Sequence, residues 1–397
     1  MTNAPTTAQP KKRFYVYPLQ DAFIWLDTED HQVCVTNAVG VLVLTHKNKS
    51  LEYITKAICS KYDVKPEKAA HDAQQILEEV EQRQQEDDAG NYLRYEPVTD
   101  YVPDRNCQAK ARSHLYLPNF TITVRSELAD LPDFLNPLFQ LTEQISPTSE
   151  KLTLDVFDEG ETFPVVFNGK TVETGFSVSD TAVKCLREIN TIVAAQFPFL
   201  MKIHASAVAT GNCALLFPAT SGSGKSTLSA YLISRGYKLI NDDTVSLLDD
   251  TRQMLPIPLS LSTKTGAWPI LDEYFPVLKD LYQHEYGDRH VKYLPVYDHQ
   301  VCTTPVDCRF IILPRYSPDY EQASIAEISP LTVFQHFTTS GCTIKKPIDP
   351  VQLGALVEWT SKIPCYRLHY SSLEHAATAI DSLVATVTTP PVRQEQG

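Results

Sequence analysis

Apolar residues at the start of the chain first occur in short runs and then recur at helical spacing. Three runs rich in aromatic and β-branched residues predict strands at 14–17, 22–26 and 33–35. Three helix candidates follow at 37–45, 51–58 and 66–80. Ser50 is placed to cap the second helix, and Pro66 suits the first turn of the third. This order predicts a small α+β domain over residues 13–84.

Strand patterns return after residue 112 and predict a larger α/β domain over residues 113–386. Its first strand candidates are 120–124, 152–156, 164–167 and 171–174. Asn168-Gly169 is a strong signal for a tight hairpin. We expect these strands to form the antiparallel flank of the domain's main sheet. We expect disorder at 1–12, a linker at 85–112 and a polar tail at 387–397.

The most informative stretch is the glycine-rich segment 219–227, ATSGSGKST. It lies between the apolar run 213–217 and a helix-like run that ends at Arg235. Strand, glycine-rich loop and helix in this order predict a P-loop, or Walker A motif. The strict pattern has glycine at the first position, where this chain has Ala219.

The residues around this segment limit the kind of sheet that carries it. Gly211-Asn212 separates a β-rich run that follows His204 from the strand before the loop, which predicts an antiparallel hairpin. A P-loop fed by a hairpin indicates a mixed sheet rather than a parallel one. The strand predicted at 237–240 ends in Asp242 and Asp243, two carboxylates placed for Mg²⁺ and for a hydroxyl nucleophile.

The loop supplies the groups that a nucleotide needs. Glycines let the backbone N–H groups point at phosphate oxygens, and the following helix directs its positive dipole end to the same place. Lys225 supplies a cation for the outer phosphates, and the Ser226 hydroxyl is a ligand for Mg²⁺. The predicted nucleotide-binding residues are Ser221, Gly222, Ser223, Gly224, Lys225, Ser226 and Thr227.

His204, the sequence SGSGKST and the segment 234–243, SRGYKLINDD, together resemble the HPr kinase/phosphorylase family and its related proteins. The resemblance implies the fold shared with phosphoenolpyruvate carboxykinase, a P-loop on a mixed sheet, with ATP and Mg²⁺ as cofactors. It also implies roles for single residues. Asp242 is the base toward a substrate hydroxyl, Asp243 binds Mg²⁺ with the loop serine, and His204 lines the catalytic site with Lys225.

The chain departs from the HPr enzymes after this segment. Their second glycine-rich signature is not found, and the corresponding region is 256–266. HPr as substrate and the phosphorylase activity are therefore not carried over. Lys264 lies where related kinases carry a Leu-x-Lys-x-Gly element and is expected to face phosphate. Arg289 or Lys292 is placed to stabilise a transferring phosphoryl group, and simple solvation of these side chains is the alternative.

The first domain, read as a winged helix, is similar to PqqD-like domains, which are called RiPP recognition elements. The similarity is carried by TNAVG, SLEYIT, YDV and ILEEV at residues 36–40, 50–55, 62–64 and 76–80. Such domains hold leader peptides of ribosomally made precursors as an added strand beside a helix. A winged helix used for dimerisation or for packing against the kinase domain is the alternative.

Composition narrows the classes of partner. A net charge of −13 disfavours nucleic acid, and no apolar run approaches the ~20 residues of a membrane span. Nine cysteines without a CxxC pair indicate neither a zinc site nor a disulfide framework and favour a cytoplasmic protein. The resemblance to HPr kinases also allows a homo-oligomer.

The sequence thus predicts an ATP- and Mg²⁺-dependent kinase that phosphorylates a Ser or Thr hydroxyl of a precursor peptide held by its N-terminal domain. A kinase of a small hydroxylated metabolite is the first alternative. A nucleotide-binding regulatory protein without turnover is the second.

Overall fold

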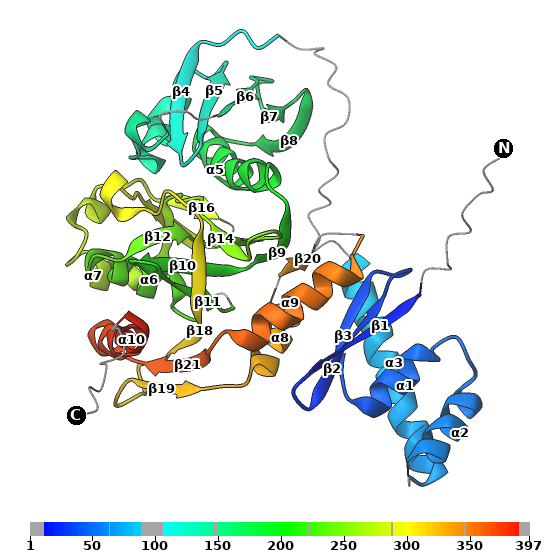
Figure 1. Ribbon diagram of the computed structural model, residues 1–397. Coiled ribbons are helices and arrows are strands. Elements are labelled where there is room, and N and C mark those ends of the chain that lie inside the picture. The colour runs from blue at the N-terminus through cyan, green and yellow to red at the C-terminus, as the bar shows by residue number, and fades with distance from the viewer. Residues whose placement is uncertain are drawn as a thin grey trace, which may run out of the picture. The chain divides into compact units, whose positions relative to one another are not determined.

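The computed structural model describes residues 12–62, 64–88, 106–146, 150–220, 222–286, 289–340, 342–344 and 347–388. They form two compact α/β units (Figure 1). Unit 1 comprises Met1–Arg94 and Pro330–Lys362, and unit 2 comprises Tyr95–Ser329 and Ile363–Gly397. Residues 1–11 of the predicted N-terminal disorder, 89–105 of the predicted linker and 389–397 of the predicted tail lie outside the described residues, as does the side chain of Arg289. The ends of the predicted linker are instead regular structure, because residues 85–88 continue a helix and residues 111–112 begin a strand.

Unit 1 begins with an antiparallel sheet in the order β1-β2-β3, as the strand pattern predicts. Its elements are β1 (Phe14–Leu19), β2 (Ala22–Asp27), β3 (Gln32–Thr36), α1 (Ala38–Thr45), α2 (Leu51–Lys61), α3 (Pro66–Asp88), α8 (Pro330–Thr339), β20 (Thr343–Ile344) and α9 (Pro350–Lys362). The Ser50 hydroxyl caps α2 by accepting a hydrogen bond from the Tyr53 N–H at 3.3 Å. Helix α3 continues past residue 84, where the sequence pattern ended the first domain.

Both faces of this small sheet are covered. Trp25 packs with Leu44 of α1 on one face, and Ile24 is fully buried on the other because side chains alternate along a strand. Tyr17 pairs with Ile24 across the strands, and its hydroxyl donates to the Pro350 carbonyl at the start of α9. The helix pair α8–α9, which the sequence analysis assigned to the domain 113–386, therefore completes the core of unit 1.

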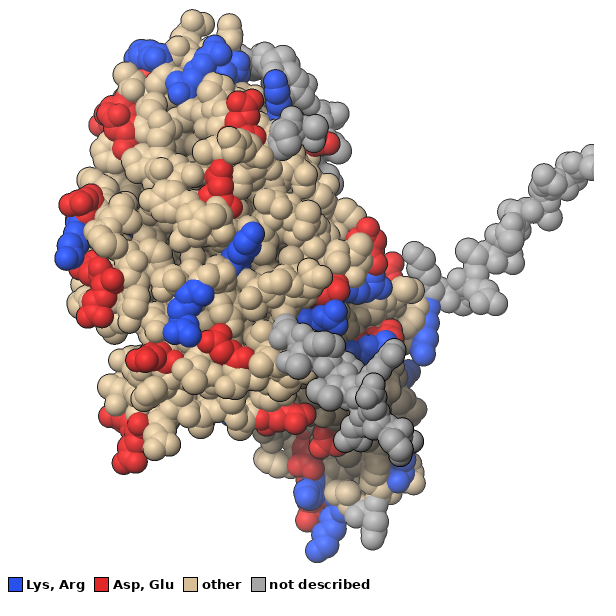
Figure 2. Space-filling model, turned by 60° about the vertical axis from the view of Figure 1, so that its left-hand side comes forward, with Lys and Arg blue, Asp and Glu red and all other residues tan. Residues whose placement is uncertain are grey.

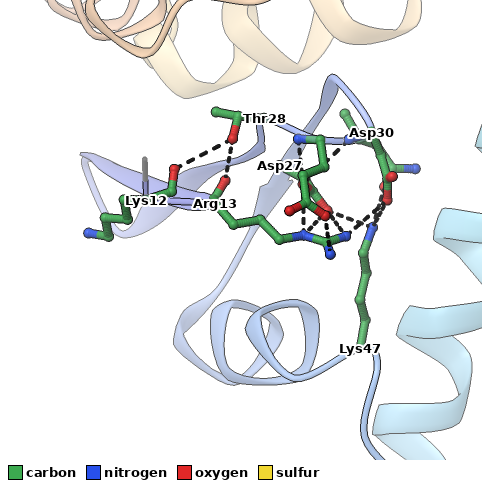
Figure 3. A network of polar contacts seen from close by, with 8 residues as sticks. Lys12, Arg13, Asp27, Thr28, Asp30 and Lys47 are labelled. Atoms are coloured by element: carbon green, nitrogen blue, oxygen red, sulfur yellow. Dashed lines mark hydrogen bonds and ion pairs between the residues drawn. The ribbon is translucent and has the colours of Figure 1, made fainter. Parts of the chain in front are cut away.

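A polar network fixes the end of β2 to its neighbours (Figure 3). The Asp27 side chain is fully buried and accepts from Arg13 Nη2 at 2.9 Å. Lys47, just after α1, lies 3.0 Å from the same carboxylate and 2.6 Å from Asp30. The network joins the first two strands to the helical layer.

Unit 2 contains a separate five-stranded sheet in the order β4-β5-β6-β7-β8. Its elements are β4 (Ala111–Leu117), β5 (Phe120–Ser126), α4 (Leu131–Leu135), β6 (Glu150–Val156), β7 (Phe163–Phe167), β8 (Lys170–Gly175) and α5 (Val178–Ala195). The predicted hairpin at Asn168-Gly169 is confirmed between β7 and β8. The expectation that these strands flank the main sheet is wrong. Helix α5 packs on β7 and β8 and also contacts β16, which belongs to another sheet. This helix therefore lies between the five-stranded sheet and the sheet that contains β16 (Figure 1).

The central sheet of unit 2 runs β12-β10-β11-β18-β14-β13-β9, with β21 and then β19 added beside β18. Its strands are β9 (Phe199–Ile203), β10 (Ala205–Thr210), β11 (Cys213–Pro218), β12 (Lys238–Asn241), β13 (Val245–Leu248), β14 (Gln253–Leu255), β18 (Val306–Tyr316), β19 (Ser324–Glu327) and β21 (Cys365–Tyr370). The predicted β10–β11 hairpin is antiparallel, whereas β11 and β18 are parallel. The sheet is therefore mixed, as predicted.

A third sheet and three helices complete unit 2. They are β15 (Leu261–Lys264), β16 (His284–Tyr286), β17 (Arg289–Leu294), α6 (Lys225–Ser234), α7 (Trp268–Leu271) and α10 (Leu373–Thr388). Acidic and basic side chains are interspersed on the face shown in Figure 2. Among the described residues, no helix combines the length and apolar character needed to cross a bilayer.

Candidate functional site

The glycine-rich segment joins β11 to α6, in the predicted order of strand, loop and helix. Gly222 and Gly224 have φ angles of +90° and +92°, which L side chains rarely adopt. A Cβ at Gly224 would also collide with the Tyr370 hydroxyl, which donates to the Gly224 carbonyl at 3.3 Å. Glycine is therefore required at both positions by the backbone, and at Gly224 by packing as well. Ser221 lies outside the described residues.

Lys225, the first residue of α6, meets His204 from the loop between β9 and β10. Lys225 Nζ lies 2.9 Å from His204 Nε2, and His204 Nδ1 lies 2.9 Å from the Asp243 carbonyl oxygen. A carbonyl only accepts, so Nδ1 carries the proton and Nε2 accepts from the ammonium. Burial, and then the charge of Lys225, lowers the pKa of His204. The Lys225 ammonium is thus held by a neutral imidazole rather than by a carboxylate.

Asp242 contacts Ser226, the second residue of the same helix. The Ser226 hydroxyl donates to Asp242 Oδ1 at 3.0 Å. The other oxygen, Oδ2, is buried and has no hydrogen-bond partner. Burial, and then the charge of Asp243, raises the pKa of Asp242, against the opposing effect of Lys225. The predicted cation and the predicted base therefore lie on the same side of the sheet.

The turn that presents the two aspartates is shaped by Asn241, whose role the sequence analysis did not identify. Its side-chain oxygen accepts from the Asp242 N–H at 2.8 Å, and its amide donates to the Thr244 carbonyl. Asp243 then takes a φ of +73°, uncommon for a residue other than glycine. Its side chain is 70% exposed. The turn therefore buries one carboxylate and exposes the next.

A cavity of about 480 Å³ opens at the start of α6. Five of the predicted nucleotide-binding residues line it at the loop: Gly222, Gly224, Lys225, Ser226 and Thr227. Lys264, at the end of β15, also lines it, and its predicted contact with phosphate stays a prediction. Ser223 lies beside it, with its carbonyl accepting from the Tyr316 N–H at 3.2 Å. His204 and Asp242 adjoin the cavity through their hydrogen bonds to Lys225 and Ser226.

Lys292 has a structural role rather than the predicted phosphate contact. Its ammonium donates to the carbonyls of Leu278 and Lys279 at 2.7 and 3.2 Å and lies 4.9 Å from the centre of the Trp268 ring. These contacts hold β17 against the segment before β16. The sequence suggested a phosphate contact because cationic residues are close together in it. It does not show that the fold brings two main-chain carbonyls within reach of the Lys292 ammonium.

Two cavity-lining tyrosines have no signal in the sequence. Tyr316 ends β18 and Tyr370 ends β21, and the parallel pairing of these strands brings the rings to 5.6 Å. Both contact the loop, through the Ser223 carbonyl and the Gly224 carbonyl respectively. Only the strand order identifies them as neighbours.

The residues present fit a magnesium ion. The Ser226 hydroxyl, the unpartnered Asp242 Oδ2 and the exposed Asp243 carboxylate are all oxygen donors, which Mg²⁺ prefers. Within the described ranges, no group of three or more His, Cys, Asp or Glu side chains could hold a metal ion. Such a sparse donor set suits an ion that takes one or two carboxylates and completes its shell with phosphate oxygens and water.

Comparison with known proteins gives two partial similarities. No protein-family model and no curated protein matches the chain. A solved structure of TbiB1 in complex with the TbiA(beta) leader peptide is 20% identical over 18% of this chain and 87% of its own, with a TM-score of 0.15. The HPr(Ser) kinase/phosphatase from Coxiella burnetii is 16% identical over 47% of this chain and 94% of its own, with a TM-score of 0.22. These are the two kinds of protein that the sequence motifs resemble.

Proposed function

We propose that this protein is a Mg²⁺-dependent kinase that transfers the γ-phosphoryl group of ATP to a Ser or Thr hydroxyl of a peptide held by unit 1. The observation that supports it best is the arrangement around the first turn of α6. Lys225 and Ser226 line an open cavity. The buried Asp242 accepts a hydrogen bond from the Ser226 hydroxyl, and its second oxygen, Oδ2, has no partner. Cation, hydroxyl and base are the parts that phosphoryl transfer requires.

In this proposal the loop and Lys225 hold the outer phosphates. Because Lys225 is paired with the neutral His204 rather than with a carboxylate, its positive charge remains available to phosphate oxygens. A bound Mg²⁺ would neutralise further charge on the phosphates. Its ligands from this chain would be Ser226 and Asp243, which leaves Asp242 Oδ2 for the acceptor hydroxyl.

The base is Asp242. The acceptor hydroxyl oxygen forms a bond to the γ-phosphorus as the bond to the β–γ bridging oxygen breaks, and ADP leaves. The hydroxyl proton passes to an Asp242 oxygen. Burial raises the pKa of this carboxyl, which makes it a stronger base than a solvated aspartate.

Unit 1 supplies the peptide in this scheme. The PqqD-like motifs of its sequence support a peptide ligand, and a peptide bound at one place presents its hydroxyl at a raised effective concentration. A long peptide acceptor also gives a reason for a second unit in a kinase.

The test is phosphate transfer from γ-labelled ATP with Mg²⁺, followed by mass spectrometry of candidate precursor peptides. The wild-type protein should add phosphate to a Ser or Thr residue, and Lys225→Met should not. Lys238→Met, a change of an exposed lysine on β12, is the matched control and should retain activity. Labelling of small hydroxylated compounds but of no peptide would support the metabolite kinase. Nucleotide binding without any transfer would refute the kinase proposal.

A further inference from the structure

The cavity in unit 2 has a second end whose chemistry the phosphate-binding loop does not explain. Away from the loop it is lined by Ala267, Ile270 and Tyr274 and by Leu373 at the start of α10. Ile270 and Tyr274 are both 41% exposed, so they are large apolar side chains left in contact with solvent inside a concave site. Such surfaces in a cavity commonly mark ligand contacts.

The position of this apolar wall relative to the loop follows from helix α6. The Tyr274 ring packs edge-on against Tyr231, with ring centroids 4.8 Å apart. Tyr231 is on α6, six residues after Lys225, which corresponds to about 9 Å along a helix axis. The apolar wall is therefore displaced along α6 from the phosphate-binding end. A nucleotide, with phosphates at one end and a base at the other, matches this spacing.

Charge orients a ligand in the cavity. Glu374 lines it on the α10 side and brings a carboxylate to that end of the cavity. A phosphate chain is repelled there and attracted to Lys225 and Lys264 at the other side. The hydroxyls of Ser371 and Ser372, which also line the cavity, suit the polar sugar between the two ends.

We propose that Ile270 and Tyr274 form the subsite for the base of a nucleoside triphosphate, so that the protein binds a nucleotide more tightly than a bare polyphosphate. This inference rests on the proposed function, because it takes the loop as the phosphate site. It assigns a binding role to the segment after β15, for which the sequence predicts only Lys264 at phosphate.

The experiment compares two ligands on the full chain by titration calorimetry, ATP and inorganic tripolyphosphate, each with Mg²⁺. Tyr274→Ala and Ile270→Ala should each weaken ATP binding about tenfold, since contact with one base accounts for that order of affinity, and should leave tripolyphosphate binding unchanged. Phe176→Ala, which removes an exposed aromatic ring of unit 2 that does not line the cavity, should change neither. Thermal melts of each variant check that the fold is retained.

The outcomes separate the two proposals. If tripolyphosphate binds and ATP affinity is unaffected by both substitutions, the base subsite is wrong and the phosphate site stands. If both ligands weaken equally, the substitutions act through the loop and the base subsite is again wrong. If the wild-type protein binds neither ligand, the proposed function fails and the inference fails with it.

Discussion

Each unit of this protein buries an aspartate at the end of a strand, and the pKa values of the two carboxyl groups are shifted in opposite directions. Asp27, the last residue of β2, receives hydrogen bonds from Arg13, Lys47 and the backbone N–H of Glu29. Burial alone would raise its pKa, but these partners outweigh it and lower the pKa to about 2 (Figure 3). Asp242, which follows β12, has an oxygen without a partner, and its pKa is raised.

The difference separates a carboxylate that holds the fold from one that is available for chemistry. The lowered pKa of Asp27 means that its ionised form stabilises unit 1. The raised pKa of Asp242 means that its ionised form costs stability. A protein keeps such a costly group only where another requirement outweighs the cost, as at a functional site. The comparison can be tested by changing each aspartate in turn.

The largest expected effect is on phosphate transfer. Asp242→Asn keeps the size of the side chain but cannot take up the acceptor proton, so turnover should fall about a thousandfold. The measurement is the initial rate of peptide phosphorylation with saturating ATP. Asp250→Asn, at an exposed position of unit 2, is the control and should retain the wild-type rate. Wild-type turnover in Asp242→Asn would remove Asp242 from the mechanism.

The next effect is on the stability of unit 1. Asp27→Asn leaves Arg13 and Lys47 without their buried counter-charge, and we expect a loss on the order of 3 kcal/mol in urea denaturation. The exposed change Asp21→Asn should be neutral. The stabilisation by Asp27 is present above pH ~4 and is lost as the pH falls from 3.8 towards 2, so the wild-type and Asp27→Asn proteins should converge there. Equal stability of the two at neutral pH would contradict the structural role.

A smaller effect of opposite sign is expected at the other aspartate. Because the folded-state pKa of Asp242 is raised, its stabilising contribution is complete below the unfolded pKa of 3.8 and is lost as the pH rises through the folded pKa. Asn does not ionise, so Asp242→Asn should be more stable than the wild type at neutral pH by on the order of 1 kcal/mol. The gain should shrink toward pH 4. A variant that is less stable than the wild type at pH 7 would show that Asp242 is structural.

The smallest effect concerns the neighbour of the base. Asp243→Asn removes the negative charge that helps to raise the pKa of Asp242, so the acid limb of the pH–rate profile should move to lower pH. Asn tolerates a positive φ, so the turn is retained. The position of the limb is the readout, because the height of the profile also depends on the metal ligands. An unmoved limb would show that another group controls it.

Local patterns predicted the parts of the molecule that short-range physics determines. The hairpin at Gly211-Asn212, the strand and helix around the glycine-rich loop and the cap at Ser50 follow from turn geometry, spacing and capping. The proximity of Lys225 and Asp242 followed from their order on adjacent elements. The separate five-stranded sheet and the packing of Tyr370 on the loop depend on contacts between distant segments, which periodicity does not encode.

Unit 1 is built from two separate stretches of the chain, Met1–Arg94 and Pro330–Lys362. This has a practical consequence for any attempt to study the two units as separate fragments. A shortened protein that starts after residue 94 would keep α8 and α9 but lose strands β1 and β3, which these helices contact, including the Tyr17 ring that lies against Gly354 of α9. Such a fragment would tend to aggregate, and its inactivity would say nothing about peptide binding. A clean separation needs residues 330–362 replaced by a short linker in one fragment and fused to residues 1–94 in the other.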